Sequence, residues 1–125
     1  MEEDRLSSNL KGGDVVLVTF PSHQPKGHEQ EGKRPAIVMG IPSGVVRYPV
    51  VLVAPLTTQT GEWVEKNPAI YPQLVAGIGG LSQNSVVLLD QPRAVDVQRV
   101  TIYFGTFPAE HYQLLLQGVK TIFEG

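Results

Sequence analysis

The sequence predicts a mainly β protein with one C-terminal α-helix, arranged as a strongly bent antiparallel sheet or a small barrel. Three observations predict this class. Short runs rich in valine, isoleucine and leucine lack helical spacing. Segments rich in proline and glycine separate these runs. The apolar pattern takes on a helical period only near the C-terminus. A bent or closed sheet also limits the exposed strand edges of a small domain.

The predicted strands follow from the β-branched, apolar character of these runs. Residues 14–20, "DVVLVTF", are predicted to form a strand with both faces largely buried, which Pro21 ends. The segment 66–84 holds many prolines and glycines and supports no assignment. We predict further strands over 35–41, 48–56, 85–90 and 99–105, and a short one around 62–65.

Residues 108–123 are predicted to form an amphipathic helix docked on the sheet. Their apolar side chains recur at helical spacing, Pro108 suits a first helical position, and Glu110 lies near the positive end of the helix dipole. Gly118 inside this helix costs about 1 kcal/mol relative to alanine. We therefore expect a close packing contact at Gly118.

A single compact domain is expected from 125 residues, of which 42% are hydrophobic and 18% charged. We predict a flexible polar tail over 1–12 and one domain over 13–125. The absence of cysteine excludes a disulfide framework, a thiolate zinc site and a cysteine nucleophile. No apolar run approaches the roughly 18 residues needed to cross a bilayer, and the N-terminus is acidic. The predicted location is therefore the cytoplasm, without a membrane partner.

The formal net charge of −2 argues against a long basic stripe for nucleic acid. Residues 1–5, "MEEDR", hold three acids and one base, so the remaining residues balance at zero. This balance is compatible with a local basic site for a short polyanionic segment.

Three polar clusters interrupt the apolar pattern, each at the edge of a predicted strand. They are the loop that opens "GHEQEGKRPAIV" (27–38), "TTQ" (57–59) and "DQPR" (90–93). A strand edge can hold a side chain firmly and still leave it exposed, so these clusters are candidates for chemistry.

Each candidate also has a plain structural interpretation. The forked donors of Arg34 match phosphate oxygens, but a solvated arginine paired with Glu29 or Glu31 is an alternative. Thr57 and Thr58 can donate hydroxyls to a phosphate and Gln59 can contact a base edge, yet these are also common strand and loop residues. Asp90 can orient an arginine or an amide, or simply begin a turn. His28 is a candidate proton carrier because histidine titrates near neutral pH.

Other kinds of site find no support in the sequence. There is no HExxH motif, no P-loop and no dinucleotide-binding fingerprint. The three histidines share no spacing typical of a catalytic metal site. We predict neither a metal ion nor a cofactor.

Taken together, the motifs resemble a known family. "GDVVLV", "GHEQEGKRPAIV", "VAPLTTQ" and "SVVLLDQPRAVD" occur in the order and approximate spacing of the MazF/PemK/Kid toxin endoribonucleases, from about Gly13 to Asp96. The resemblance implies an SH3-like barrel of the CcdB/MazF type with a terminal helix, assembled as a homodimer. It also implies metal-independent, sequence-specific cleavage of single-stranded RNA and inhibition by a cognate MazE-like antitoxin.

By position, Arg34 and Thr57 resemble the family's principal catalytic pair. His28 and Glu29 correspond to loop positions implicated in some members, and Asp90 to an acid implicated in others. One departure is Leu88, which stands where some PemK/Kid members have an arginine, so an acid–base scheme built on that arginine does not transfer.

The side chains themselves suggest a division of labour. Arg34 and Thr57 would stabilise charge on the phosphate, and His28 with Glu29 would handle the proton. The residues predicted to bind RNA are Lys33, Lys26, Thr58, Gln59, Asp90 and Gln91. The alternatives are a CcdB-type gyrase-poisoning toxin and a non-catalytic binding module on the same fold.

Overall fold

The computed structural model describes residues 9–22, 27–28 and 30–125. Within these ranges most of the elements are β-strands, and η1 and η2 are short 3₁₀ helices. In chain order they are β1 (Asp14–Phe20), β2 (Gly32–Gly40), β3 (Val50–Thr57), α2 (Glu62–Lys66), β4 (Gln73–Leu74), η1 (Ile78–Gly80), β5 (Ser85–Val87), β6 (Arg93–Asp96), η2 (Val97–Arg99), β7 (Val100–Thr106) and α3 (Ala109–Glu124).

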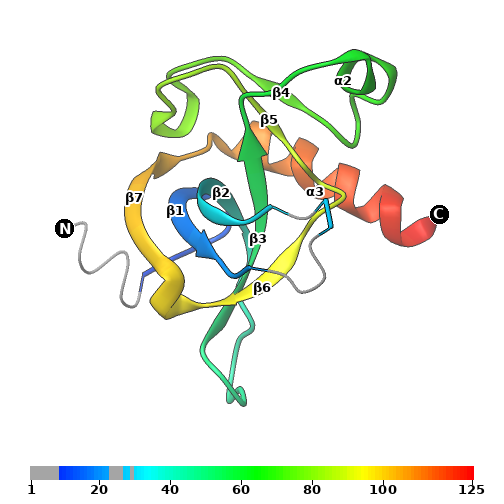
Figure 1. Ribbon diagram of the computed structural model, residues 1–125. Coiled ribbons are helices and arrows are strands. Elements are labelled where there is room, and N and C mark those ends of the chain that lie inside the picture. Colours follow the sequence, from blue (N-terminus) through cyan, green and yellow to red (C-terminus); the bar gives the residue numbers. More distant parts are fainter. Residues whose placement is uncertain (1–8, 23–26, 29) are drawn as a thin grey trace.

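The strands form one curled antiparallel sheet in the order β4-β5-β3-β2-β1-β7, with β6 also pairing with β3. Every strand pair within the described ranges is antiparallel. In Figure 1 the sheet bends into a half-barrel, α3 lies at one side of it, and β4 and α2 project together at the top. This architecture confirms the predicted mainly β class with a C-terminal helix.

Both faces of β1 are largely buried, as predicted for 14–20. Alternate residues of β1 enter two different clusters, because successive side chains of a strand point to opposite faces. One cluster lies between the sheet and α3, and comprises Val15, Ile37, Ala54, Leu56, Leu74, Leu81, Val87, Leu89, Phe107 and Leu115. The other fills the inside of the curl, and comprises Val16, Val18, Phe20, Ala36, Val38, Val51, Val53, Val95 and Val100.

The C-terminal helix packs closely at Gly118 against the segments that precede β4 and follow β5. A Cβ atom at this position would lie 2.5 Å from both the Ala69 oxygen and Leu89 Cδ1. The close packing contact predicted there is therefore present. The Tyr112 hydroxyl donates a hydrogen bond of 2.7 Å to the Met39 carbonyl, and burial raises the pKa of that hydroxyl.

The two ends of the sheet meet through glycines. Gly80 in η1 has φ +77°, and a methyl group there would overlap the carbonyl of Phe104 in β7. A Cβ atom on Gly105 would lie 2.7 Å from the backbone of Gly79. The backbones of η1 and β7 therefore approach as closely as only glycine allows.

The start of β2 differs from the start of the predicted strand. β2 begins at Gly32, which pairs with Phe20, so Lys33 and Arg34 are strand residues. Pro35 therefore lies inside β2, where the predicted strand over 35–41 began with it. It is accommodated because the β2–β3 ladder begins only at Ala36, so Pro35 has a strand neighbour on one side alone.

The short strand predicted around 62–65 is wrong, because these residues form helix α2. Only Val64 of this helix is buried, and Lys66 pairs with Glu62 one turn earlier at 3.4 Å. A single turn with one buried residue satisfies its backbone locally, whereas a strand would need a partner for its backbone groups.

Three further segments can be compared with their predictions: 66–84, 85–90 and the tail over 1–12. The unassigned segment 66–84 contains β4 and η1, and the strand predicted over 85–90 ends at Val87. Residues 9–12 of the predicted tail are described, and Lys11 N–H donates to Asp14 Oδ2 at 3.0 Å. Among the described residues, no helix is long and apolar enough to span a membrane.

Candidate functional site

Arg34 and Thr57 lie near the same end of two neighbouring strands, β2 and β3. The last residue pair of the β2–β3 ladder at this end is Ala36 with Pro55. Beyond that pair, Arg34 is paired with Val18 of β1, and Thr57 is paired with Val86 of β5. Arg34 is exposed, and its Nε donates to the Glu31 carbonyl at 3.1 Å.

The Thr57 hydroxyl is oriented by the turn that follows β3. Its oxygen accepts a hydrogen bond of 3.1 Å from the backbone N–H of Gln59. A hydroxyl carries one hydrogen in addition to its acceptor sites, so Thr57 can accept from Gln59 and still donate to an anion. Thr57 is partly exposed at the end of the strand.

A bulge between β5 and β6 presents Asp90 and Gln91. Val87 pairs with Leu56 and Arg93 pairs with Val53, so five residues (88–92) lie opposite only two residues of β3 (54–55). The extra residues cannot stay in the ladder and form a turn, in which Gln91 N–H donates to the Leu88 carbonyl at 3.1 Å. The turn carries Asp90 and Gln91 out of the sheet, and Arg93 begins β6.

The same motif holds the end of the loop that contains His28. The Gln91 side-chain oxygen accepts from the Gln30 backbone N–H at 3.2 Å. Arg93 Nη1 donates to the Gln30 carbonyl at 3.1 Å, and the Arg93 guanidinium carbon lies 5.2 Å from the centre of the Phe20 ring. Gln30 is therefore fixed through both of its backbone groups, only two residues after His28.

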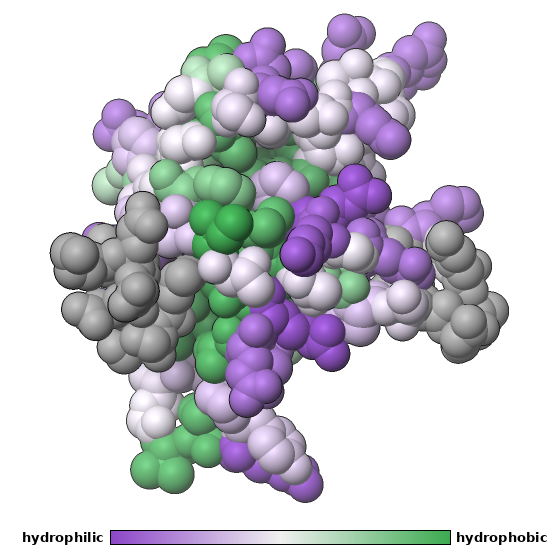
Figure 2. All heavy atoms as spheres, turned by 60° about the vertical axis from the view of Figure 1, so that its left-hand side comes forward, coloured by the Kyte–Doolittle hydropathy of each residue, from purple (hydrophilic) through white to green (hydrophobic). Residues whose placement is uncertain are grey.

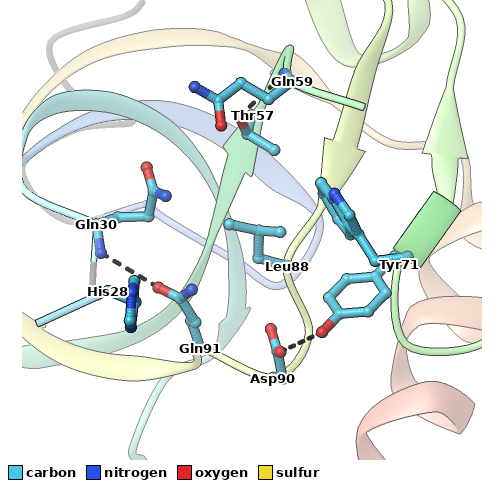
Figure 3. Close-up of a pocket in the computed structure, with 9 residues that line it drawn as sticks. His28, Gln30, Thr57, Gln59, Tyr71, Leu88, Asp90 and Gln91 are labelled. Atoms are coloured by element: carbon cyan, nitrogen blue, oxygen red, sulfur yellow. Dashed lines mark hydrogen bonds between the residues drawn. The ribbon is translucent and has the colours of Figure 1, made fainter. Parts of the chain in front are cut away.

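These elements surround a cavity of about 480 Å³. Figure 3 shows His28, Gln30 and Gln91 at one side of it, Tyr71 and Asp90 at the other, and Leu88 between them. Trp63 and Tyr71 form an edge-to-face pair, with ring centroids 4.8 Å apart and an interplanar angle of 84°. The lining residues are His28, Gln30, Thr57, Gln59, Trp63, Tyr71, Leu88, Asp90 and Gln91.

The structure brings together some of the predicted site residues and separates others. Those that line the cavity are His28, Thr57, Gln59, Asp90 and Gln91. Lys33 and Arg34 are exposed at the start of β2, outside this lining. Thr58 lines a smaller neighbouring cavity of about 160 Å³. Lys26 and Glu29 lie outside the described residues.

Four lining residues were not predicted from the sequence. They are Gln30, Trp63, Tyr71 and Leu88. Trp63 is the one tryptophan of the chain and stands in a polar segment shortly after "TTQ", which was a usable signal. Tyr71 gave no such signal, because it lies in the segment that could not be assigned.

The Tyr71 hydroxyl is bound to Asp90, to which it donates a hydrogen bond of 2.5 Å. This hydrogen bond, together with partial burial and the negative charge of Asp90, raises the pKa of Tyr71 above that of free tyrosine. A raised pKa in the folded state means that the contact stabilises the fold fully below the ordinary tyrosine pKa of about 10 and is lost as pH rises beyond it.

Asp90→Ala is therefore expected to lower the midpoint of Tyr71 ionisation toward about pH 10, because both the acceptor and the charge are removed. The midpoint is measured by the ultraviolet absorbance of tyrosinate, with Tyr71→Phe subtracted to remove the other tyrosines. An unchanged midpoint in Asp90→Ala would show that the hydrogen bond does not form in solution.

No group of three or more His, Asp or Glu side chains within residues 9–22, 27–28 and 30–125 is placed to hold a metal ion. The chemistry that the described side chains offer is hydrogen-bond donation to an anion from Arg34 and Thr57, and proton transfer at His28. The amides and Asp90 add donors and acceptors along the cavity wall.

Comparison with solved structures supports the same fold. The crystal structure of MazF from Deinococcus radiodurans is 25% identical, with a TM-score of 0.70, covering 92% of this chain and 96% of that chain. A MazE–MazF complex from the same organism gives 26% identity and a TM-score of 0.65, over 91% of this chain and 95% of that chain. An endoribonuclease in complex with its cognate antitoxin, from Mycobacterial species, is 14% identical with a TM-score of 0.62, covering 91% and 94%. This last likeness concerns the fold alone.

Comparison by sequence identifies the family. No curated protein matches the chain. The model of a toxin family matches residues 11–123, which include the whole curled sheet and nearly all of α3. The solved relatives agree with that match, and the chain belongs to the PemK-like, MazF-like toxins of type II toxin–antitoxin systems.

Proposed function

We propose that this protein is a sequence-specific endoribonuclease toxin that cleaves single-stranded RNA without a metal ion. One observation supports this most strongly. Thr57 lines the same cavity as His28, and Arg34 lies on β2, two residues before the β2–β3 ladder begins at Ala36 with Pro55. In this proposal the Thr57 hydroxyl and the Arg34 guanidinium bind the phosphate, and His28 moves the proton.

The nucleophile in this proposal is the 2′-hydroxyl of the RNA itself. It attacks the adjacent phosphorus, the bond to the 5′-oxygen breaks, and the products carry a 2′,3′-cyclic phosphate and a 5′-hydroxyl. DNA lacks this hydroxyl and would not be cut. Negative charge grows on the phosphoryl oxygens in the transition state, where the Arg34 guanidinium and the Thr57 hydroxyl would stabilise it through preorganised hydrogen bonds.

One proton must leave the 2′-hydroxyl and another must reach the leaving oxygen. The guanidinium of an arginine is a poor base in general. His28 is exposed at the cavity, and the clamp on Gln30 holds its end of the loop near the bulge. We assign proton transfer to His28, with Glu29 as its partner.

His28→Ala is expected to lower the maximal rate of RNA cleavage about 100-fold, because general acid–base catalysis typically contributes 10²–10⁴. The pH–rate profile should also lose the limb that depends on histidine ionisation. His111→Gln, which changes a histidine on α3 outside the cavity, serves as the control. If His28→Ala kept both the rate and the profile of the parent protein, the assignment would be wrong.

The partners in this proposal are a MazE-like antitoxin and a second copy of the chain. The antitoxin is supported by the solved MazE–MazF complex, which is similar to this chain over 91% of its length. A homodimer is supported by exposed apolar side chains of the kind that interfaces bury, including Val45, Val46 and Tyr48 in the β2–β3 connection. Figure 2 shows hydrophobic residues, in green, at the bottom of the view and in the middle of the face that it presents. The site of action would be the cytoplasm, where RNA is accessible.

Incubation of the purified protein with a defined RNA in EDTA, followed by mapping of the cut sites and ends, tests the proposal. Cleavage at a few short motifs with cyclic phosphate ends is the expected result. Cleavage that requires added metal, or products with 5′-phosphates, would contradict the mechanism. A gyrase-poisoning toxin or a binding module would leave the RNA intact.

A further inference from the structure

One wall of the cavity is aromatic. Trp63 comes from α2 and Tyr71 from the segment that follows it, and both line the cavity. Their rings meet edge to face, at 84° and 4.8 Å between centroids. In such a pair the ring that offers its edge keeps both of its faces uncovered by the partner. The Trp63 residue is 38% exposed, so the wall is open to a ligand.

Contacts with neighbouring parts of the chain fix the position of this aromatic wall. The Tyr71 hydroxyl is tied to Asp90 on the bulge, and the buried Val64 of α2 anchors the helix that carries Trp63. Leu88, 5% exposed, supplies an apolar surface between the aromatic wall and the Thr57 end. A flat, largely apolar ligand would therefore find a preformed surface.

At the Asp90 end of the cavity, the charge of the lining favours a neutral ligand over a phosphate. Of the described residues, those that line the cavity include neither lysine nor arginine, and Asp90 carries a negative charge. A phosphate at this end would be repelled by Asp90, and Arg34 and Lys33, which could bind it, lie outside the lining. Aromatic rings, side-chain amides and one carboxylate are instead the groups that stack on nucleobases and contact base edges.

The Asp90 carboxylate also favours one kind of nucleobase over another. Its Oδ2 accepts from Tyr71, which leaves Oδ1 as an acceptor within the described part of the chain. A carboxylate can only accept hydrogen bonds, so it suits a base that presents an exocyclic amino group. Cytosine presents an amino group at the position where uracil presents a carbonyl oxygen.

We infer that the wall formed by Trp63, Tyr71 and Asp90 is a nucleobase subsite, which stacks one base of the RNA beside the cleaved bond and prefers cytosine over uracil. The inference rests on the proposed function for the identity of the ligand. It adds a specificity role for Trp63 and Tyr71 and an amino-group acceptor role for Asp90.

The fluorescence of Trp63, the one tryptophan of the chain, reports directly on stacking. The probes are 2′-O-methyl oligomers of cytidine and of uridine, which cannot be cut through a 2′-hydroxyl, and an abasic oligomer of the same length. The cytidine oligomer is expected to quench the fluorescence and to bind about 10-fold more tightly than the uridine oligomer, since a good base contact is worth that much discrimination. The abasic oligomer should cause no quenching.

Two substitutions separate stacking from amino-group recognition. Trp63→Ala is expected to weaken cytidine oligomer binding about 10-fold, measured by anisotropy of a labelled oligomer, while Trp63→Phe retains most of the affinity. Phe123→Ala, which removes an exposed aromatic ring at the end of α3, is the matched control. In Asp90→Asn the amide oxygen can still accept from Tyr71, and the amide nitrogen becomes a donor, so the preference should shift toward uridine.

The outcomes distinguish the subsite from the cleavage activity. Quenching and a cytosine preference support the subsite even if no RNA is cut, in which case the proposed function fails alone. Cleavage of RNA without quenching, or with Trp63→Ala indistinguishable from Phe123→Ala, overturns the subsite alone. Equal binding of the two oligomers, unchanged in Asp90→Asn, overturns the assigned role of Asp90.

Discussion

Arg34→Ala is expected to lower the single-turnover rate of RNA cleavage by about 10²–10³, the loss typical of one preorganised donor to a developing oxyanion. The Arg34 side chain is exposed, and its hydrogen bond to the Glu31 carbonyl is a surface contact. The midpoint of thermal unfolding should therefore change little. The effect should appear in the cleavage rate, because the proposed role of Arg34 is to bind the phosphate.

Two further variants make this result specific. Arg34→Lys keeps the charge but loses the fork that matches two phosphate oxygens, so an intermediate rate is expected. Arg47→Ala removes another exposed arginine, on the β2–β3 connection and outside the cavity, and should cleave at the parent rate. Equal losses in Arg34→Ala and Arg47→Ala would show that general positive charge, rather than the position of Arg34, supports the reaction.

Gly80→Ala is expected to lower the free energy of unfolding by about 3 kcal/mol, the sum of a left-handed backbone penalty and overpacking in a close contact. Gly80 has φ +77°, and its new methyl group would overlap the Phe104 carbonyl where η1 meets β7. Denaturant unfolding measures the loss.

Gly44→Ala provides a control with nearly the same backbone conformation. Gly44 has φ +78°, but a Cβ atom added to it would meet no heavy atom within 4 Å, so only the conformational penalty of about 1 kcal/mol is expected. The difference between the two variants isolates the η1–β7 contact. If both variants lost the same amount, that contact would not stabilise the half-barrel.

Some elements could be predicted because one local pattern dominated. Residues 14–20 are rich in β-branched residues and form β1 over the predicted range. The helix over 108–123 has a long apolar period and a proline at its start, and α3 covers Ala109–Glu124. The window at 62–65 is too short to separate the two periods, and burial of Val64 favoured a helix.

The interruption after β5 could not be predicted from the pattern, because Leu88 and Leu89 continue the apolar run beyond Val87. Whether such residues stay in a strand depends on how many residues the partner strand offers opposite them. The pairing of β3 with both β5 and β6 sets that number. No short stretch of sequence contains all three strands.

The candidate site was predicted in part from the sequence. Thr57, Asp90 and Gln91 were expected at strand edges, and they line one cavity. The turn that presents Asp90 and Gln91 depends on how β3 pairs with β5 and β6, and the aromatic wall depends on how α2 packs. Both are long-range consequences of the fold, so sequence spacing alone did not reveal them.

The central claim is that the RNA supplies its own nucleophile at the Arg34–Thr57 site. The most direct measurement compares two RNAs that are identical except for one 2′-deoxynucleotide on the 5′ side of a mapped cut. This mechanism predicts that the substituted bond is no longer cleaved while other cut sites react at unchanged rates, and that Arg34→Ala slows those sites alike. Cleavage of the deoxy-substituted bond at the parent rate would contradict it.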